Sequence, residues 1–358
     1  MKRNVLLFSF TLLLILGALP FLGKAPAEIN SLFVSNEQLR TVNESIAWKG
    51  TPKSEDGKFR NLYQPFESRF SDLLKWKLSR NPQREAKRAD KRVLEVQAAQ
   101  ELVSGVNDFL IWLGHASFLM RKDGVTFLID PILIDNLFLK RQSELPLALA
   151  KLPKIDFLLI SHNHRDHCDQ STVEYLASKN PDMTVLTGLG MSEVLTPWLA
   201  GQQIQEAGWF QQYDLLDSAV QVVYVPTRHW SRRGLMDENE QLWGVFFFRF
   251  ANTSIYFMGD SGYGAHFADI KSVLGSPDYA LLGVGAFKPE WFMHQSHISP
   301  TDAIRVANEI GAENFFPMHF GTFDLSDEPP LEPLDILLEN ADKINGRFIF
   351  PVIGKNIW

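Results

Sequence analysis

The stretch Ser-His-Asn-His-Arg-Asp-His at residues 161–167 places three imidazoles and a carboxylate within six successive positions, 162–167. The whole chain of 358 residues contains only nine histidines. The stretch directly follows the apolar run 157–160, which has the length of a buried strand. Neutral imidazole and carboxylate are the usual zinc ligands, so the stretch predicts a metal site, with a polar surface loop as the simpler alternative.

Three more candidate ligands lie outside this stretch, each shortly after an apolar run. Taken singly, each fits a structural histidine or a turn aspartate better than a ligand. Taken together with residues 161–167, they place potential ligands at the ends of several strands, and this favours the metal site. The three are His229, which follows residues 220–225, Asp260, which follows residues 254–258, and His319, which follows residues 315–318.

Apolar runs and helical patterns alternate from Asp108 onward, which is typical of a layered α/β fold. Ser299-Pro300-Thr301-Asp302 is a helix start, with serine as N-cap and proline at the first position. Residues 28–95 show no clear strand alternation, and 70–92 predict one or two basic helices with a break at Pro82. The predicted strands are 109–113, 125–129, 157–160, 220–225, 242–250 and 253–258, and the predicted helices are 171–178, 192–199, 265–274, 300–310 and 334–341.

The N-terminus has the pattern of a secretory targeting segment. Lys2 and Arg3 precede an apolar run from residue 5 to residue 23, which as a helix would be about 28 Å long, close to the thickness of a hydrocarbon core. Residues 1–27 are therefore predicted to be either a cleaved signal peptide or an uncleaved membrane anchor. In both cases we expect the body of the protein to be exported, into a bacterial periplasm or anchored at the inner membrane.

The charge is divided unevenly along the chain. Lys and Arg number 35 against 42 Asp and Glu, and the net charge of −7 argues against a nucleic-acid-binding protein. Residues 1–92 contain 17 basic and 9 acidic side chains, a net charge of +8, whereas the rest of the chain carries −15. Because basic residues are attracted to anionic lipid, we predict that the first quarter holds the acidic part against a membrane surface. The single cysteine, Cys168, excludes a disulfide scaffold.

The pattern His-x-His-x-Asp-His, followed by a distant histidine, aspartate and histidine, resembles the metallo-β-lactamase superfamily. Flanking motifs are similar to one branch of it, the phospholipases D that hydrolyse N-acylphosphatidylethanolamine and their bacterial relatives. The resemblance runs from about residue 45 to the C-terminus. The motifs lie at 112–117, 129–131, 229–233, 242–244, 259–263, 291–293 and 319–323.

The resemblance implies the fold and the domain organisation. The fold would be α/β, an αβ/βα sandwich of two mixed β-sheets flanked by helices, with a helical or irregular N-terminal extension. Residues 28–95 would form this basic extension, packed on or preceding the catalytic domain, and residues 96–358 would form the hydrolase domain.

The resemblance also implies a pair of zinc ions that share a hydroxide. The ligand types would suit iron or manganese as well. The first ion would bind His162, His164 and His229, the second would bind Asp166, His167 and His319, and Asp260 would bridge the two. The implied substrate is a phospholipid like N-acylphosphatidylethanolamine, cleaved to phosphatidate and an N-acylethanolamine.

Residues around the predicted ligands have further predicted roles, each with a plainer alternative. The family places a substrate-side histidine at His297, which would act with Asp166 and Asp260 as a catalytic residue; the alternative is a simple loop histidine. Arg232 and Arg233 would bind an anionic head group, or form ion pairs with the acidic residues at 237–240.

Two further residues near the predicted ligands are expected to support them. Asp130 is predicted to accept a hydrogen bond from a ligand imidazole, and the alternative is a turn carboxylate before Pro131. His115 is predicted to be a buried, hydrogen-bonded structural histidine that is able to contact the site.

Two other classes of function compete with the phospholipase. The same metal pair would hydrolyse a lactone, a β-lactam, a thioester or a small phosphodiester, because pocket walls rather than metals select the substrate. A non-catalytic envelope protein on this fold would be favoured by a missing ligand, but every predicted ligand position is occupied. The sequence says nothing about oligomeric state.

Overall fold

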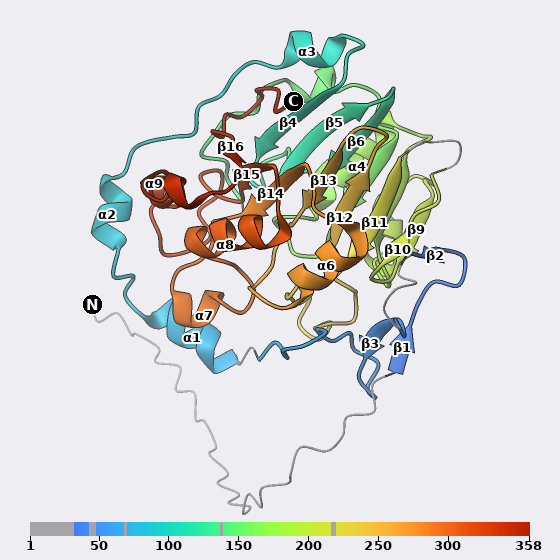
Figure 1. Cartoon of the computed structure of the whole chain (residues 1–358), viewed down its shortest axis with the longest axis horizontal. Coiled ribbons are helices and arrows are strands. Elements are labelled where there is room, and N and C mark those ends of the chain that lie inside the picture. Colours follow the sequence, from blue (N-terminus) through green and yellow to red (C-terminus); the bar gives the residue numbers. More distant parts are fainter. Residues whose placement is uncertain (1–31, 43–47, 68–69, 137–138, 216–219) are drawn as a thin grey trace, which may run out of the picture. The chain divides into compact units, whose positions relative to one another are not determined.

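The computed structural model describes residues 32–42, 48–67, 70–136, 139–215 and 220–358. Two mixed β-sheets form the centre of this part of the chain (Figure 1). The smaller sheet has six strands, and its first two strand pairs are antiparallel and its last three pairs parallel. Its order is β4 (Phe109–Gly114), β5 (Ser117–Lys122), β6 (Val125–Ile129), β7 (Phe157–Ile160), β8 (Thr184–Gly188) and β9 (Ile204–Ala207).

The larger sheet has eight strands and is built from the second half of the chain, except for one strand. That exception is β2 (Arg40–Thr41), which pairs with β10 at the sheet edge. The strands from β13 to β16 are parallel and the others antiparallel. The order is β16 (Arg347–Phe348), β15 (Asn314–Met318), β14 (Tyr279–Gly283), β13 (Ser254–Phe257), β12 (Val245–Arg249), β11 (Gln221–Val225), β10 (Gln211–Gln212) and β2.

An aromatic core joins the two sheets. The ring of Phe118 on β5 lies edge-on to Phe257 of β13 at 6.0 Å, and Phe127 on β6 lies edge-on to Phe248 of β12 at 5.7 Å. All four side chains are buried. Burying one phenylalanine contributes roughly 1.5–3 kcal/mol, so this layer fixes how the strand ends of one sheet face those of the other.

Helices cover the outer faces of both sheets. Val173 and Leu176 of α4 (Gln170–Lys179) pack in one apolar cluster with strands β7 and β8 of the six-stranded sheet. The helices α6 (His266–Leu274), α8 (Pro300–Ile310) and α9 (Glu332–Glu339) pack along the eight-stranded sheet (Figure 1). The side chain of Ser299 accepts a hydrogen bond from the amide of Asp302, which confirms the predicted start of α8. Short elements complete the fold: α3 (Gln100–Ser104), η1 (Leu149–Lys151), α5 (Ser192–Leu195), η2 (Thr196–Trp198), α7 (Glu290–Met293) and η3 (Ala341–Lys343).

The predicted α/β sandwich is confirmed, and the predicted strands and helices match observed elements to within a few residues. Residues 28–95, in which no clear strand alternation was found, also contain the short strands β1 (Leu32–Val34), β2 and β3 (Thr51–Lys53). Strands of two or three residues are too short to show an alternating pattern. Within the described residues, no helix combines the length and apolarity needed to cross a bilayer. The predicted targeting segment, residues 1–27, lies outside the described residues.

Residues 59–67 and 70–92, called the strap below, run past several loops instead of adding to a layer. They contain the two predicted basic helices, α1 (Phe70–Leu78) and α2 (Arg84–Ala89), with Pro82 between them. Figure 1 shows α1 beside α7, where the ring of Trp76 lies 5.3 Å from that of Phe292. The strap therefore touches loops that follow strands of the eight-stranded sheet.

Candidate metal centre

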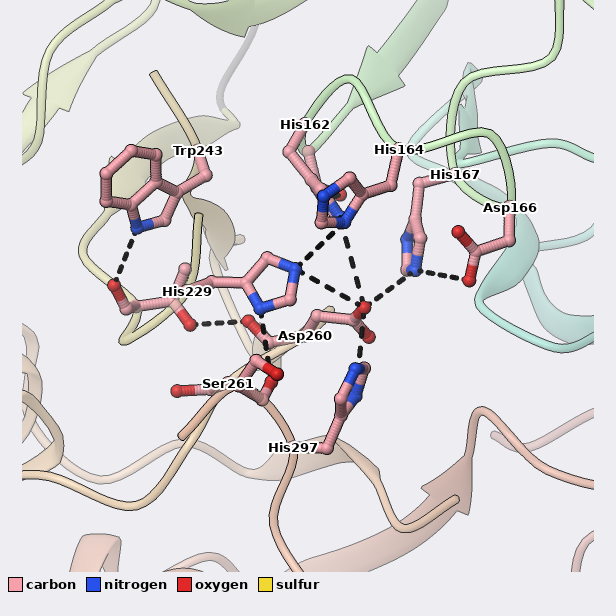
Figure 2. A network of polar contacts seen from close by, with 12 residues as sticks. His162, His164, Asp166, His167, His229, Trp243, Asp260, Ser261 and His297 are labelled. Carbon is pink, nitrogen blue, oxygen red and sulfur yellow. Dashed lines mark hydrogen bonds and ion pairs between the residues drawn. The ribbon is translucent and has the colours of Figure 1, made fainter. Parts of the chain in front are cut away.

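The candidate ligands meet where strands of both sheets end. His162, His164 and the pair Asp166 and His167 lie in the loop after β7 of the six-stranded sheet. The other candidates, His229, Asp260 and His319, follow β11, β13 and β15 of the eight-stranded sheet. The structure therefore brings all seven predicted ligands to one place, and Figure 2 shows several of their rings pointing toward Asp260.

A first cluster consists of His162, His164, His229 and Asp260, whose ligand atoms all lie within 4.8 Å of one another. The Nδ1 atom of His164 is 2.9 Å from Nε2 of His162 and 3.0 Å from Nε2 of His229. The Oδ2 atom of Asp260 lies 3.7 Å from Nε2 of His229. These are the three histidines predicted for the first ion, together with the predicted bridging carboxylate.

A second cluster contains Asp166, His167 and His319, the residues predicted for the second ion. The Nε2 atoms of His167 and His319 are 3.2 Å apart. Asp260 reaches this cluster too, with Oδ1 2.9 Å from His319 Nε2 and Oδ2 3.2 Å from His167 Nε2. Asp260 thus lies between the two clusters, where a bridging ligand would have to be.

Hydrogen bonds to the outer ring nitrogens leave the inner nitrogens free to bind a metal. Nδ1 of His162 contacts Ser161 Oγ at 2.9 Å, and Nδ1 of His229 contacts the Ser296 carbonyl at 3.1 Å. In the first cluster two ring nitrogens converge on the single Nδ1 of His164, and one proton cannot satisfy both contacts. A cation placed between these three nitrogens would contact the lone pair of each, so the residues fit a metal ion.

The electrostatics of the two clusters differ. Burial lowers the pKa of His162 and His229 well below the usual value and that of His164 to about 4, so these imidazoles are neutral and able to bind a metal. Burial would also lower the pKa of His319, but Asp260 and Asp166 raise it to about 9. The buried carboxylates therefore require positive charge beside them, which divalent ions would supply in place of protons.

Asp130 makes the contacts that its predicted role requires. Its buried carboxylate accepts hydrogen bonds from the Ser161 amide at 2.7 Å, from Ser161 Oγ at 2.5 Å and from His167 Nδ1 at 2.8 Å. It therefore links two loops of the site and orients His167. The role of Asp130 as a support for a metal ligand stays a prediction that this geometry favours.

His115 lies closer to the centre than its predicted structural role demands. It is buried, with Nε2 3.1 Å from Asp166 Oδ2 and its ring 4.0 Å from that of His319. Its ligand atom falls within 4.8 Å of those of the second cluster. Burial lowers its pKa to about 3, so it is neutral and donates to Asp166.

His297 faces the centre, whereas the two arginines are differently placed. Nδ1 of His297 lies 3.9 Å from Asp260 Oδ2, and burial lowers its pKa to about 4. Arg232 lines the pocket, and its guanidinium donates to the carbonyls of Gly234 and Leu235. The guanidinium of Arg233 donates instead to backbone carbonyls of the His162–Cys168 loop. Both arginines thus hold loops through carbonyl oxygens, instead of the predicted carboxylates.

A pocket of about 440 Å³ opens onto both clusters. Its lining combines four of the candidate ligands with apolar side chains. Phe66, Leu73 and Trp76 of the strap contribute to the apolar part of the lining, and the sequence did not reveal this role because no motif links the strap to the distant ligands. The polar residues that line the pocket are His164, Arg165, Asp166, Arg232, Glu238, Asp260, Ser296, His297 and His319, and the apolar ones are Phe66, Leu73, Trp76, Trp230, Ala286, Phe292, Met293 and Leu325.

The fold and the buried His/Asp clusters define a metallo-hydrolase of the β-lactamase type, and comparison with known proteins agrees. A family model described as a beta-lactamase superfamily domain matches residues 126–320. The chain is 32% identical over 278 residues to N-acyl-phosphatidylethanolamine-hydrolyzing phospholipase D 1 of Caenorhabditis elegans, which covers 71% of this chain and 77% of that protein. It is 31% identical over 256 residues to the mitochondrial N-acyl-phosphatidylethanolamine-hydrolyzing phospholipase D of Saccharomyces cerevisiae, covering 68% of this chain and 54% of that protein.

Solved structures give the same fold. Igni18, a metallo hydrolase from the archaeon Ignicoccus hospitalis, superimposes with a TM-score of 0.55 at 20% identity, covering 70% of this chain and 97% of Igni18. The chain therefore belongs to the metallo-β-lactamase superfamily and is a metal-dependent hydrolase similar to the N-acylphosphatidylethanolamine-hydrolysing phospholipases D.

Proposed function

We propose that this protein is a binuclear zinc phosphodiesterase of the phospholipase D type that hydrolyses N-acylphosphatidylethanolamine-like lipids. One observation carries the proposal: two adjacent His/Asp clusters open onto a pocket whose lining also contains eight apolar residues. A phosphodiester bound at the clusters would be able to place its apolar substituents against these side chains. Similarity to the worm and yeast enzymes supports the choice of lipid.

The donor set suits two zinc ions. His162, His164 and His229 would hold the first, Asp166, His167 and His319 the second, and Asp260 would contact both. When bound, such ions would lower the pKa of water toward 7 and stabilise negative charge on phosphate oxygens.

The chain's own residues prepare the site for this reaction. Ser161 and Ser296 fix two of the ligand rings through their outer nitrogens, and Asp130 fixes His167. His297 is neutral and lines the pocket beside Asp260, so it is placed to donate a hydrogen bond to a phosphate or leaving-group oxygen. Trp230 and Phe292 line the same pocket and would limit the access of water to it.

A lipid bilayer is the proposed source of the substrate and a proposed partner. Two helices that contribute apolar side chains to the pocket also expose apolar side chains to the outside: Leu74 and Leu78 on α1, and Trp291 on α7. Lys75 lies over the Trp291 ring at 4.4 Å, so positive charge accompanies this apolar rim. Such a combination binds anionic membranes. We include export to a membrane surface in the proposal, supported by the basic and apolar pattern at the N-terminus.

Turnover of a defined lipid tests the proposed reaction. Purified, zinc-loaded protein would be mixed with N-acylphosphatidylethanolamine in detergent micelles, and the products analysed by mass spectrometry. We expect an N-acylethanolamine and phosphatidate, and no product after metal removal. Hydrolysis of a lactone, β-lactam, thioester or small phosphodiester without any lipid turnover would refute the lipid substrate.

Liposome sedimentation tests the membrane surface separately. Leu74→Glu should weaken binding to anionic vesicles, because it places a negative charge on the apolar rim. Leu338→Glu on α9 is the matched control, since Leu74 and Leu338 are 46% and 47% exposed. Equal binding by both variants would argue against the α1 rim as the docking surface.

A further inference from the structure

The loop that carries His229 contacts the strap, in addition to an isolated β-bridge between Arg228 and Gly262. His229 lies in the connection 226–244 between β11 and β12, to which the structure assigns no helix or strand. In contrast, His319 directly follows the end of β15, and His162 lies two residues after the end of β7. A ligand in such a connection needs fixed contacts from elsewhere in the molecule.

Asn61 of the strap supplies these contacts to the backbone of His229. Its Nδ2 donates to the His229 carbonyl at 2.9 Å, and its Oδ1 accepts from the His229 amide at 3.1 Å. One side chain therefore pairs with both backbone polar groups of the same residue. Trp243 Nε1, on the far end of the same connection, also donates to Asn61 Oδ1, at 3.3 Å.

A second strap residue supports the next position of the loop. The ring of Phe66 stacks on that of Trp230, with centroids 5.2 Å apart and planes at 8°. Trp230 in turn lies edge-on to the ring of His164 at 4.5 Å. The strap thus contacts two neighbouring residues beside the first cluster, one through the backbone and one through an aromatic stack.

We propose that Asn61 is a positioning residue for the first metal ion, an inference that rests on the proposed metal centre. Asn61 fixes the backbone of His229, and the Ser296 carbonyl fixes its Nδ1. With both ends held, Nε2 faces His164 and Asp260. Asn61 lies outside residues 126–320, the part that matches the superfamily model.

Zinc affinity of the full chain tests this inference. Asn61→Ala removes both contacts with His229, and we expect the affinity for one of two zinc equivalents to fall about 10- to 100-fold, the usual effect of losing a group that orients a ligand. Competition with a chromophoric chelator measures the affinity. The matched control is Asn308→Ala, because Asn308 also pairs with a backbone carbonyl and amide, those of Lys343 and Asn345, but on α8 away from the site.

A second variant at the same position is needed if Asn61→Ala does not fold. Asn61→Asp retains the shape and the acceptor for the His229 amide but cannot donate to the His229 carbonyl, so its zinc affinity should also fall. Unchanged affinity for both equivalents in a folded Asn61 variant would overturn the inference. Because the readout is zinc binding, a protein that binds two zinc ions yet does not cleave the lipid would refute the proposed substrate and leave the role of Asn61 measurable.

Discussion

Replacing Asp130 by asparagine tests how the second cluster is oriented. The carboxylate accepts from the Ser161 amide on one oxygen, and from Ser161 Oγ and His167 Nδ1 on the other. An amide accepts on one side only. The asparagine side chain of Asp130→Asn can be placed in two orientations. In either orientation its NH₂ group faces at least one of the N–H or O–H donors of Ser161 and His167.

The backbone N–H of Ser161 cannot move, so we expect the amide oxygen to stay with it. The NH₂ group then faces Nδ1 of His167, which must lose its proton, and the proton moves to Nε2. Nε2 is the nitrogen that faces Asp260 and His319, so His167 no longer offers a lone pair to the second ion. Loss of such an orienting contact typically weakens metal binding about 10- to 100-fold, equivalent to about 1.4–2.7 kcal/mol.

Chelator competition on the zinc-loaded protein measures this change. We expect the affinity for the second zinc ion to fall and the affinity for the first zinc ion to stay nearly normal. Asp278→Asn is the matched control, because Asp278 also accepts from an amide and a hydroxyl of one serine, Ser254, at 2.6 and 2.8 Å. Asp278 lies at the start of β14, away from the strand ends that carry the ligands. Equal zinc affinities in Asp130→Asn and wild type would refute the tautomer argument.

Three other perturbations test the pocket wall, the metal and the packing of the site. Trp76→Ala removes a ring contact with Phe292 and a hydrogen bond to Asp327. The KM for a long-chain lipid should therefore rise about 2- to 10-fold, in line with roughly 0.5–1.5 kcal/mol for an aromatic contact. An equal rise in KM for a small soluble diester would argue against binding of an acyl chain by these residues. Removing metal should lower Tm, because at 100 times Kd a ligand stabilises the folded state by about 2.7 kcal/mol, and calorimetry with and without zinc would detect it; an unchanged Tm would argue against metal binding by the folded state. Gly285→Ala would place a Cβ 2.0 Å from the His319 carbonyl oxygen, so circular dichroism and zinc analysis should show impaired folding or loss of the second zinc ion. The control is Gly105→Ala, because a Cβ at Gly105 would lie no closer than 3.5 Å to its neighbours.

The sequence predicted the central strands and the candidate ligands because both have strong local signals. Residues 157–160 form a short apolar run, and three histidines follow within a few positions. The strap shows the opposite case. Its basic residues predicted contact with a membrane, but Asn61, Phe66 and Trp76 act through partners that lie more than 150 residues away in the chain. No local pattern encodes such pairings, so the strap's place in the pocket could only be seen in three dimensions.

His115 illustrates a second limit of the sequence. It was predicted to be buried and hydrogen-bonded, as it is, but its closeness to Asp166 and His319 depends on a turn with φ of 52° at His115. A positive φ is uncommon outside glycine, and the residue type alone does not reveal it.

The distribution of ligands between the two sheets has a consequence for assembly. Strands β4 to β9 come from one contiguous half of the chain and carry His162, His164 and the 166–167 pair, whereas His229, Asp260 and His319 come from the other half. The first cluster draws its residues from both halves, and so does the second. Zinc would therefore bind tightly only after the halves have docked. In a chain cut in the connection between β9 and β10, zinc would therefore be expected to strengthen the association of the two fragments.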